Sequence, residues 1–140
     1  MVGSLTQARV HERLLRDAGV RLDRAGSSLL YKLHASAEPL RVTDLAELLG
    51  VDTPTVTRKI QQLEREQLVS RHADPDDGRA TRIRLTRAGA RTLEKVLKAR
   101  RNWLEHLVAD WDDAERAQFA ALFGRFSDAL REDIEDVRDH

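Results

Sequence analysis

The sequence predicts a mostly α-helical fold with one small β-hairpin. The chain of 140 residues is rich in Leu, Ala, Arg and Glu, with 41% hydrophobic and 34% charged residues, which is typical of a folded helical protein. Apolar residues recur every three or four positions along most of the chain, the period of an amphipathic helix. The period changes only within residues 69–85, where two runs of strand character flank a turn rich in Asp, Pro and Gly.

Three helices are expected in the first part of the chain. They cover residues 5–17, 22–37 and 42–49, and their apolar stripes are Val10, Leu14 and Leu15, then Leu29, Leu30 and Leu33, then Val42, Leu45, Leu48 and Leu49. Gly19, Pro39 and Gly50 follow their ends, where such residues stop a helix.

A fourth helix is expected from residue 53 to about residue 67. Thr53 is the expected N-cap, because its hydroxyl can accept an unpaired N–H of the first turn, and Pro54 suits the first helical position. Val56, Ile60 and Leu63 share one face, which we expect to be buried.

The outward face of this helix contains no carboxylate. It carries Pro54, Thr55, Arg58, Gln61, Gln62 and Arg65, with Thr57 on its flank. Hydroxyl, amide and guanidinium groups are those that contact phosphates and base edges in DNA. An ordinary solvated helix face is the alternative interpretation.

Residues 69–73 and 80–85 are the expected strands of the hairpin. In the second run Thr81, Ile83 and Leu85 alternate with arginines, the pattern of a half-buried strand. Helix, tight turn, helix and hairpin is the order of a winged helix-turn-helix, in which the second helix enters a major groove. Arg79 at the tip can reach a narrow minor groove, and Asp77 can hold its guanidinium in one orientation. The alternative is that the Asp residues are present because Asp is favoured in turns, and that Arg79 only balances their negative charge.

Two long helices are expected after the hairpin. Thr86 should cap the first, which runs to about residue 109, and Asp112 with Glu115 resembles a capping box for the second, which runs to about residue 137. Both are apolar over many turns, so we expect a second subunit to cover part of them. The expected segments are N-terminal helices for dimer contact and lobe packing (1–38), a winged helix-turn-helix DNA-binding domain (39–89) and C-terminal dimerisation helices (90–140).

The charges are unevenly distributed although the net charge is zero. Residues 53–91 hold nine Arg and Lys against five acids, whereas residues 105–140 hold four basic residues against eleven acids. One face could therefore approach a polyanion while the rest stays clear of it. The alternative is that the two segments are ordinary solvated helix surfaces, which would show the same uneven distribution of charged residues.

Several classes of function are unexpected for this sequence. The chain has no cysteine, which excludes disulfides, thiolate zinc sites and thiol nucleophiles. The five histidines lack metal-ligand spacing, and no phosphate loop or nucleophile elbow is present, so we expect no metal, no cofactor and no enzyme activity. The absence of an apolar run of membrane length and of a signal peptide suggests a cytoplasmic protein without membrane contact.

Four stretches together resemble the MarR family of transcription regulators. They are LRVTDLAELLGVDTPTVTRKI (40–60), LEREQLV (63–69), DPDDGRA (74–80) and LTRAG (85–89). The resemblance implies a homodimer, usually a repressor, on a pseudo-palindromic site in double-stranded DNA. It implies that Thr55, Thr57 and Arg58 lie in the major groove, that Asp77 and Arg79 form the wing pair, and that Thr43 contacts phosphate. The full expected DNA-binding set is Thr43, Thr53, Pro54, Thr55, Thr57, Arg58, Lys59, Gln62, Asp77, Arg79 and Arg82.

The resemblance also implies a small-molecule effector, often an aromatic acid, between the dimer helices and the DNA-binding lobe. The candidates for contacting it are His11, Arg13, Tyr31, His34 and Trp103. The alternative is that Tyr31 and Trp103 are core or interface residues and that His11 and His34 are surface residues. Gly78 departs from the many relatives that carry a second arginine there, and the segment before residue 20 is short. A winged-helix module that docks an acidic protein without reading bases is the alternative function.

Overall fold

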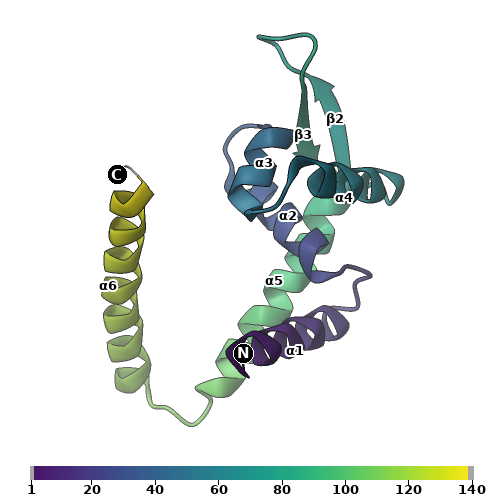
Figure 1. Ribbon diagram of the computed structural model, residues 1–140. Coiled ribbons are helices and arrows are strands. Elements are labelled where there is room, and N and C mark those ends of the chain that lie inside the picture. The colour runs from purple at the N-terminus through teal and green to yellow at the C-terminus, as the bar shows by residue number, and fades with distance from the viewer. Residues whose placement is uncertain (1, 139–140) are drawn as a thin grey trace. The chain divides into compact units, whose positions relative to one another are not determined.

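The computed structural model describes residues 2–138 and confirms a mostly helical fold with a small antiparallel sheet (Figure 1). The elements in chain order are α1 (Val2–Asp17), α2 (Arg24–Ala35), β1 (Leu40–Arg41), α3 (Val42–Leu49), α4 (Thr53–Arg65), β2 (Val69–Ala73), β3 (Thr81–Leu85), α5 (Arg87–Leu107) and α6 (Asp113–Arg138). The chain forms two compact units, Met1–Trp103 and Leu104–His140.

The core of the first unit gathers the apolar stripes of α2, α3 and α4 beneath the sheet. Leu29, Leu45, Ile60 and Ile83 are fully buried in one cluster, which Leu93 of α5 joins. Val56 and Leu63 are also buried, so the inner face predicted for α4 is confirmed. This burial fixes the rotation of α4 about its axis and therefore determines which side chains point outward.

The sheet has the strand order β1-β3-β2. In the hairpin, β2 pairs antiparallel with β3 from Val69 opposite Leu85 to Ala73 opposite Thr81. The short β1 also pairs with β3, with Leu40 opposite Ile83. This third strand was not predicted from the sequence, because two residues are too few to show a period.

The turn between α3 and α4 follows the expected glycine, but the cap lies one residue earlier than predicted. Gly50 adopts the left-handed conformation (φ 64°) that ends α3. The N-cap of α4 is Asp52, whose carboxylate accepts a hydrogen bond from the Thr55 N–H at 2.7 Å. The prediction of Thr53 as N-cap is therefore wrong: Thr53 is the first helical residue. Asp and Thr are both good caps, so their order alone does not separate them.

The junction of the hairpin with α5 depends on Thr86 and Gly89. The Thr86 hydroxyl donates to the Gln67 carbonyl at 2.6 Å and accepts from the Gly89 N–H at 3.0 Å, which agrees with its predicted role as a cap. A Cβ on Gly89 would lie 2.0 Å from the Leu68 carbonyl oxygen. Only glycine allows the first turn of α5 to lie this close to the backbone of Leu68, which directly precedes β2.

In the second unit, α6 begins with the predicted capping box. The Glu115 N–H donates to the Asp112 carboxylate at 2.8 Å and the Asp112 N–H donates to Glu115 at 2.9 Å. Farther along, α6 exposes an apolar row of Phe119, Leu122, Phe123, Phe126 and Leu130. No helix in residues 2–138 combines the length and the apolar character needed to cross a membrane.

Candidate nucleic-acid interface

The outward face of α4 presents the polar set that the helical period predicted. Thr55, Arg58, Gln61 and Arg65 are exposed, and Thr57 is half-buried on the flank. Thr53 and Pro54 are exposed in the first turn, and Thr43 is exposed near the start of α3. An exposed helix N-terminus with hydroxyls and a guanidinium can contact both base edges and phosphates.

The first turn of α4 is held by Asp52. Hydrogen bonds from the Thr55 hydroxyl and from its backbone N–H hold the pKa of the Asp52 carboxyl below its usual value. The ionised carboxylate at this end of the helix also interacts favourably with the helix dipole. Thr55 is consequently fixed in orientation before any ligand arrives.

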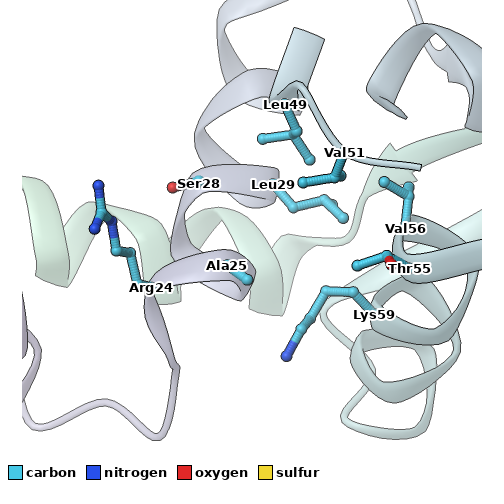
Figure 2. Close-up of a pocket in the computed structure, with 9 residues that line it drawn as sticks. All are labelled: Arg24, Ala25, Ser28, Leu29, Leu49, Val51, Thr55, Val56 and Lys59. Atoms are coloured by element: carbon cyan, nitrogen blue, oxygen red, sulfur yellow. The ribbon is translucent and has the colours of Figure 1, made fainter. Parts of the chain in front are cut away.

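Two of the predicted DNA contacts on α4, Lys59 and Gln62, have partners within the chain. The Lys59 ammonium donates to the Asp23 carboxylate at 2.5 Å and to the Gln62 side-chain oxygen at 2.9 Å. Gln62 in turn donates to Glu66 at 3.1 Å. The Lys59 side chain is only 17% exposed, and it extends toward α2 rather than out from the face of α4 (Figure 2).

Asp23 links this network to the start of α2. Its carboxylate also accepts from the Gly26 N–H at 2.7 Å, which caps the helix. Partial burial opposes ionisation of Asp23, but the hydrogen bonds from Lys59 and Gly26 outweigh it and hold the pKa of Asp23 below its usual value. A charged pair thus joins α4 to the N-cap of α2.

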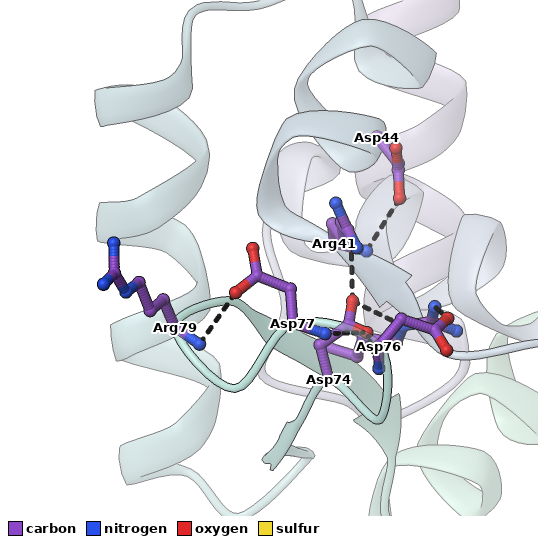
Figure 3. A network of polar contacts seen from close by, with 7 residues as sticks. Arg41, Asp44, Asp74, Asp76, Asp77 and Arg79 are labelled. Atoms are coloured by element: carbon purple, nitrogen blue, oxygen red, sulfur yellow. Dashed lines mark hydrogen bonds and ion pairs between the residues drawn. The ribbon is translucent and has the colours of Figure 1, made fainter.

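The base of the wing is organised by Asp74, a residue that the sequence analysis treated only as part of the turn. Its buried carboxylate accepts from the Arg41 Nε at 2.7 Å, the Arg82 Nε at 3.0 Å and the Asp76 N–H at 2.9 Å (Figure 3). The hydrogen bonds from Arg82, from the Asp76 N–H and from Arg41 hold the pKa of Asp74 far below its usual value despite the burial. Arg82, a predicted DNA contact, is therefore engaged beneath the wing.

The tip of the wing differs from the expected arrangement of Asp77 and Arg79. The Asp77 carboxylate accepts from the backbone N–H of Arg79 at 3.0 Å, and the guanidinium extends away from it (Figure 3). The expectation that Asp77 holds the guanidinium is therefore wrong, because the short turn brings the backbone donor closer. Arg79 is exposed and makes no ion pair with another described residue, so its charge is available to a partner.

The residues predicted to contact an effector do not line a single cavity. His11 and Tyr31 line a cavity of about 280 Å³ between α1, α2 and α5, together with Lys32, Leu97 and Arg100. His34 lies beside a separate hollow with Glu38 and Arg84, and Trp103 is half-buried on α5. Sequence reasoning missed Lys32 and Arg100, because only the packing of α2 against α5 brings them together.

Within this cavity the His11 Nε2 atom is buried without a hydrogen-bond partner. Burial, followed by the nearby charge of Arg24, lowers the pKa of His11. The cavity thus combines a neutral His11 imidazole with the positive charges of Lys32 and Arg100. Such a cavity favours an anionic ligand over a cationic one. Among the described residues, no group of three or more histidines and carboxylates is placed to hold a metal ion.

Known proteins resemble this chain in sequence and in structure. The sequence profile of the MarR family matches residues 26–81. YxaD, an uncharacterised HTH-type transcriptional regulator of Bacillus subtilis, is 32% identical over 109 residues, which are 78% of this chain and 76% of its own. The crystal structure of the transcriptional regulator Tm0710 from Thermotoga maritima matches with a TM-score of 0.73 and 27% identity, over 95% of this chain and 92% of its own. The crystal structure of MarR matches with a TM-score of 0.70 and 26% identity, over 96% and 94%. This chain therefore belongs to the MarR family of transcription regulators.

Proposed function

We propose that the protein regulates transcription by binding a specific DNA sequence through α4 and the wing. The exposed, acid-free N-terminal half of α4 carries this proposal, because it presents Thr55 and Arg58 on a helix fixed by its buried face. Arginine recognises guanine with two hydrogen bonds, and threonine can contact phosphate or a thymine methyl. Membership of this family does not favour the alternative of a protein-interaction module without base readout.

The other DNA contacts are assigned according to whether each side chain is exposed or already engaged by another residue of the chain. Thr53, Pro54 and Thr57 accompany Thr55 and Arg58 in the major groove, Thr43 contacts phosphate, and Arg79 enters the minor groove with Asp77 shaping its turn. Lys59 and Gln62 reach DNA only if they leave Asp23 and Glu66. Arg82 acts through the wing that it supports.

The experiment is binding to the DNA upstream of its own gene, measured by fluorescence anisotropy at several salt concentrations. We expect affinity to fall steeply with salt, because phosphate contacts release counterions. Arg58→Ala should cost about 1–3 kcal/mol of discrimination between specific and random duplex. Arg65→Ala, an exposed arginine at the other end of α4, is the matched control and should keep that discrimination. No preference over random duplex, or a flat salt dependence, would overturn the proposal.

The second unit supports the proposal of a homodimer on a pseudo-palindromic site. Leu104 and Leu107 at the end of α5, and Phe123 and Phe126 in the apolar row of α6, are each at least 44% exposed. Exposed apolar surface of this extent is typical of an interface. Sedimentation equilibrium should give a dimer, and Phe126→Glu should shift it toward monomer. Ala121→Glu, an exposed site on the same helix outside the apolar row, should remain dimeric. A monomeric wild-type protein would contradict the assignment.

A small-molecule effector in the cavity with His11 and Tyr31 completes the proposal. Lys32 and Arg100 at this cavity favour an anionic, aromatic acid-like molecule, whose binding releases the protein from DNA and relieves repression in the cytoplasm. His34 and Trp103 are outside this assignment. Titrating the DNA complex with a panel of aromatic acids tests it: release by an acid, lost in Tyr31→Ala, is expected, and release that is independent of Tyr31 would contradict it.

A further inference from the structure

The tip of the wing contains an Asp-Gly pair, Asp77 followed by Gly78, in the turn between β2 and β3. Of the seven glycines in the sequence, only Gly78 follows an Asp or Asn. Glycine has no Cβ to shield its amide nitrogen, so this nitrogen can attack the side chain of the preceding residue. We propose that Asp77 converts spontaneously to isoaspartate in the folded protein, and that the converted wing binds DNA more weakly.

The conversion needs no reagent other than water. The Gly78 nitrogen attacks the side-chain carboxyl carbon of Asp77, and its proton leaves with the carboxyl OH as water, which closes a cyclic imide. Water then adds to one of the ring carbonyl carbons, and the bond from that carbon to nitrogen breaks. Opening at the main-chain carbonyl gives isoaspartate, in which the chain continues through the former side chain and the former main-chain carbonyl becomes a carboxylate. The mass of the protein is unchanged.

The folded wing leaves this reaction open at Asp77. Asp77 and Gly78 are exposed, and no atom beyond the chain neighbours lies within 4 Å of the position that a Cβ on Gly78 would take, so the ring has room to form. The Gly78 N–H donates no hydrogen bond to another described residue, which leaves its nitrogen free. The Asp77 carboxylate is turned toward the residues that follow it, because it accepts from the Arg79 N–H at 3.0 Å (Figure 3).

Two other Asp residues of the same loop are protected from this reaction. Attack on Asp76 would use the N–H of Asp77, which donates to the buried Asp74 carboxylate at 3.3 Å. The Cβ of Asp77 also crowds that nitrogen, whereas Gly78 has none. Asp74 is followed by Pro75, which has no N–H to lose. Within this loop, conversion is therefore confined to Asp77.

Conversion would open the tip, because both hydrogen bonds that close it end on Asp77. The Ala80 N–H donates to the Asp77 main-chain carbonyl at 3.0 Å, as in a β-turn, and the Arg79 N–H donates to the Asp77 side chain. Isoaspartate exchanges the roles of these two acceptor groups and lengthens the backbone by one carbon. Neither donor then finds its acceptor in place. The Arg79 guanidinium is consequently displaced from the minor groove, a step that rests on the proposed function.

The first test follows isoaspartate in the full chain during incubation at neutral pH. Trypsin releases residues 72–79 as one peptide, because Arg71 precedes it and Arg79 ends it. Methylation by protein isoaspartate methyltransferase and electron-transfer fragmentation then locate the modified residue. We expect isoaspartate at Asp77 and none at Asp76.

Gly78→Ala is the matched variant for this test. Its methyl group shields the attacking nitrogen but meets no other atom, and the residue has no positive φ, so the fold is retained. Isoaspartate should accumulate several times more slowly in this variant. A synthetic peptide of residues 72–79, incubated alongside, shows how fast the unfolded sequence converts. A protein that is still unmodified when the peptide has converted overturns the site, as does equal accumulation in Gly78→Ala.

The second test compares the DNA affinity of fresh and incubated protein by fluorescence anisotropy. We expect the isoaspartate form, separated by ion exchange, to bind about tenfold more weakly, as when one charge-assisted contact is lost. Repair by the methyltransferase with its methyl donor, which returns isoaspartate to Asp through the same imide, should restore the affinity. Incubated Gly78→Ala should bind like fresh Gly78→Ala.

The outcomes of the second test separate the coupling from the proposed function. An isoaspartate form that binds DNA like fresh protein overturns the coupling, as does an equal loss of affinity in incubated Gly78→Ala. Fresh protein that does not bind DNA at all contradicts the proposed function instead, and leaves the test of the modification standing.

Discussion

At the scale of single residues, Asp74 determines how the wing presents Arg79. One buried carboxylate joins Arg41 before α3, Arg82 on β3 and the backbone of the wing loop. We expect Asp74→Asn to lower DNA affinity by about tenfold, because a neutral amide replaces two charge-assisted acceptor contacts and the loop loses its fixed position. Base preference should change little, since Arg58 is untouched. Fluorescence anisotropy with specific and random duplexes measures both quantities.

The matched control is Asp76→Asn in the same loop. The Asp76→Asn substitution removes the same formal charge as Asp74→Asn. The Asp76 side chain, however, is 80% exposed, and its carboxylate lies 3.6 Å from the Arg82 guanidinium. Exposed pairs of this kind contribute little, so the control should keep wild-type affinity apart from the gain expected from losing one negative charge near DNA. An equal loss in the two variants would mean that the buried network does not position the wing.

The same residues show where sequence reasoning reaches its limit. The period of α4 predicted its buried and outward faces, because burial repeats with the helix. The expected DNA-binding set also included Lys59, which in the structure pairs with Asp23, 36 residues away. Such partners depend on the packing of α2 against α4, which a helical period does not contain.

At the scale of elements, the contact between the first turn of α5 and the start of the hairpin depends on Gly89. A methyl group there would meet the Leu68 carbonyl oxygen at 2.0 Å, so either α5 or the chain at Leu68 must move. We expect Gly89→Ala to lower the free energy of unfolding by at least about 2 kcal/mol, as overpacking of a rigid contact does. Urea denaturation followed by circular dichroism measures the change.

Gly78→Ala is the control for this prediction. A Cβ on Gly78 has no atom within 4 Å, and the residue has no positive φ. The substitution should leave stability unchanged or raise it by about 0.5 kcal/mol, because alanine restricts the unfolded chain. If Gly89→Ala is as stable as Gly78→Ala, the close approach of α5 to Leu68 is not a constraint on the fold.

The element boundaries also separate what the sequence contains from what packing adds. Thr86 and the pair Asp112 and Glu115 were predicted as caps and confirmed, because capping depends on residues within one turn. The strand β1 was missed, since Leu40 and Arg41 are extended only through pairing with β3. Local signals therefore predicted the helices and hairpin well, and the third strand came from tertiary contact.

At the scale of the whole molecule, four ionisable groups give stability a pH dependence with two parts. Burial lowers the pKa of His11 from its usual 6.5, so the unfolded chain takes up this proton at a higher pH than the folded chain. Stability should therefore fall as the pH drops below 6.5. The pKa values of Asp23, Asp52 and Asp74 are also lowered, from 3.8. Their contribution is complete above about pH 5 and is lost as the pH falls through 3.8 and below.

Urea denaturation between pH 3 and pH 8 should resolve the two parts, because each belongs to a different side chain. His11→Gln should flatten the profile between pH 5 and pH 7 and leave the acid part unchanged, since it removes only the buried imidazole. Asp74→Asn should lower stability at pH 7 and reduce the slope below pH 4, since the variant has no carboxylate to protonate there. A wild-type profile that is flat from pH 3 to pH 8 would contradict the assigned directions, as would an acid slope that Asp74→Asn leaves intact.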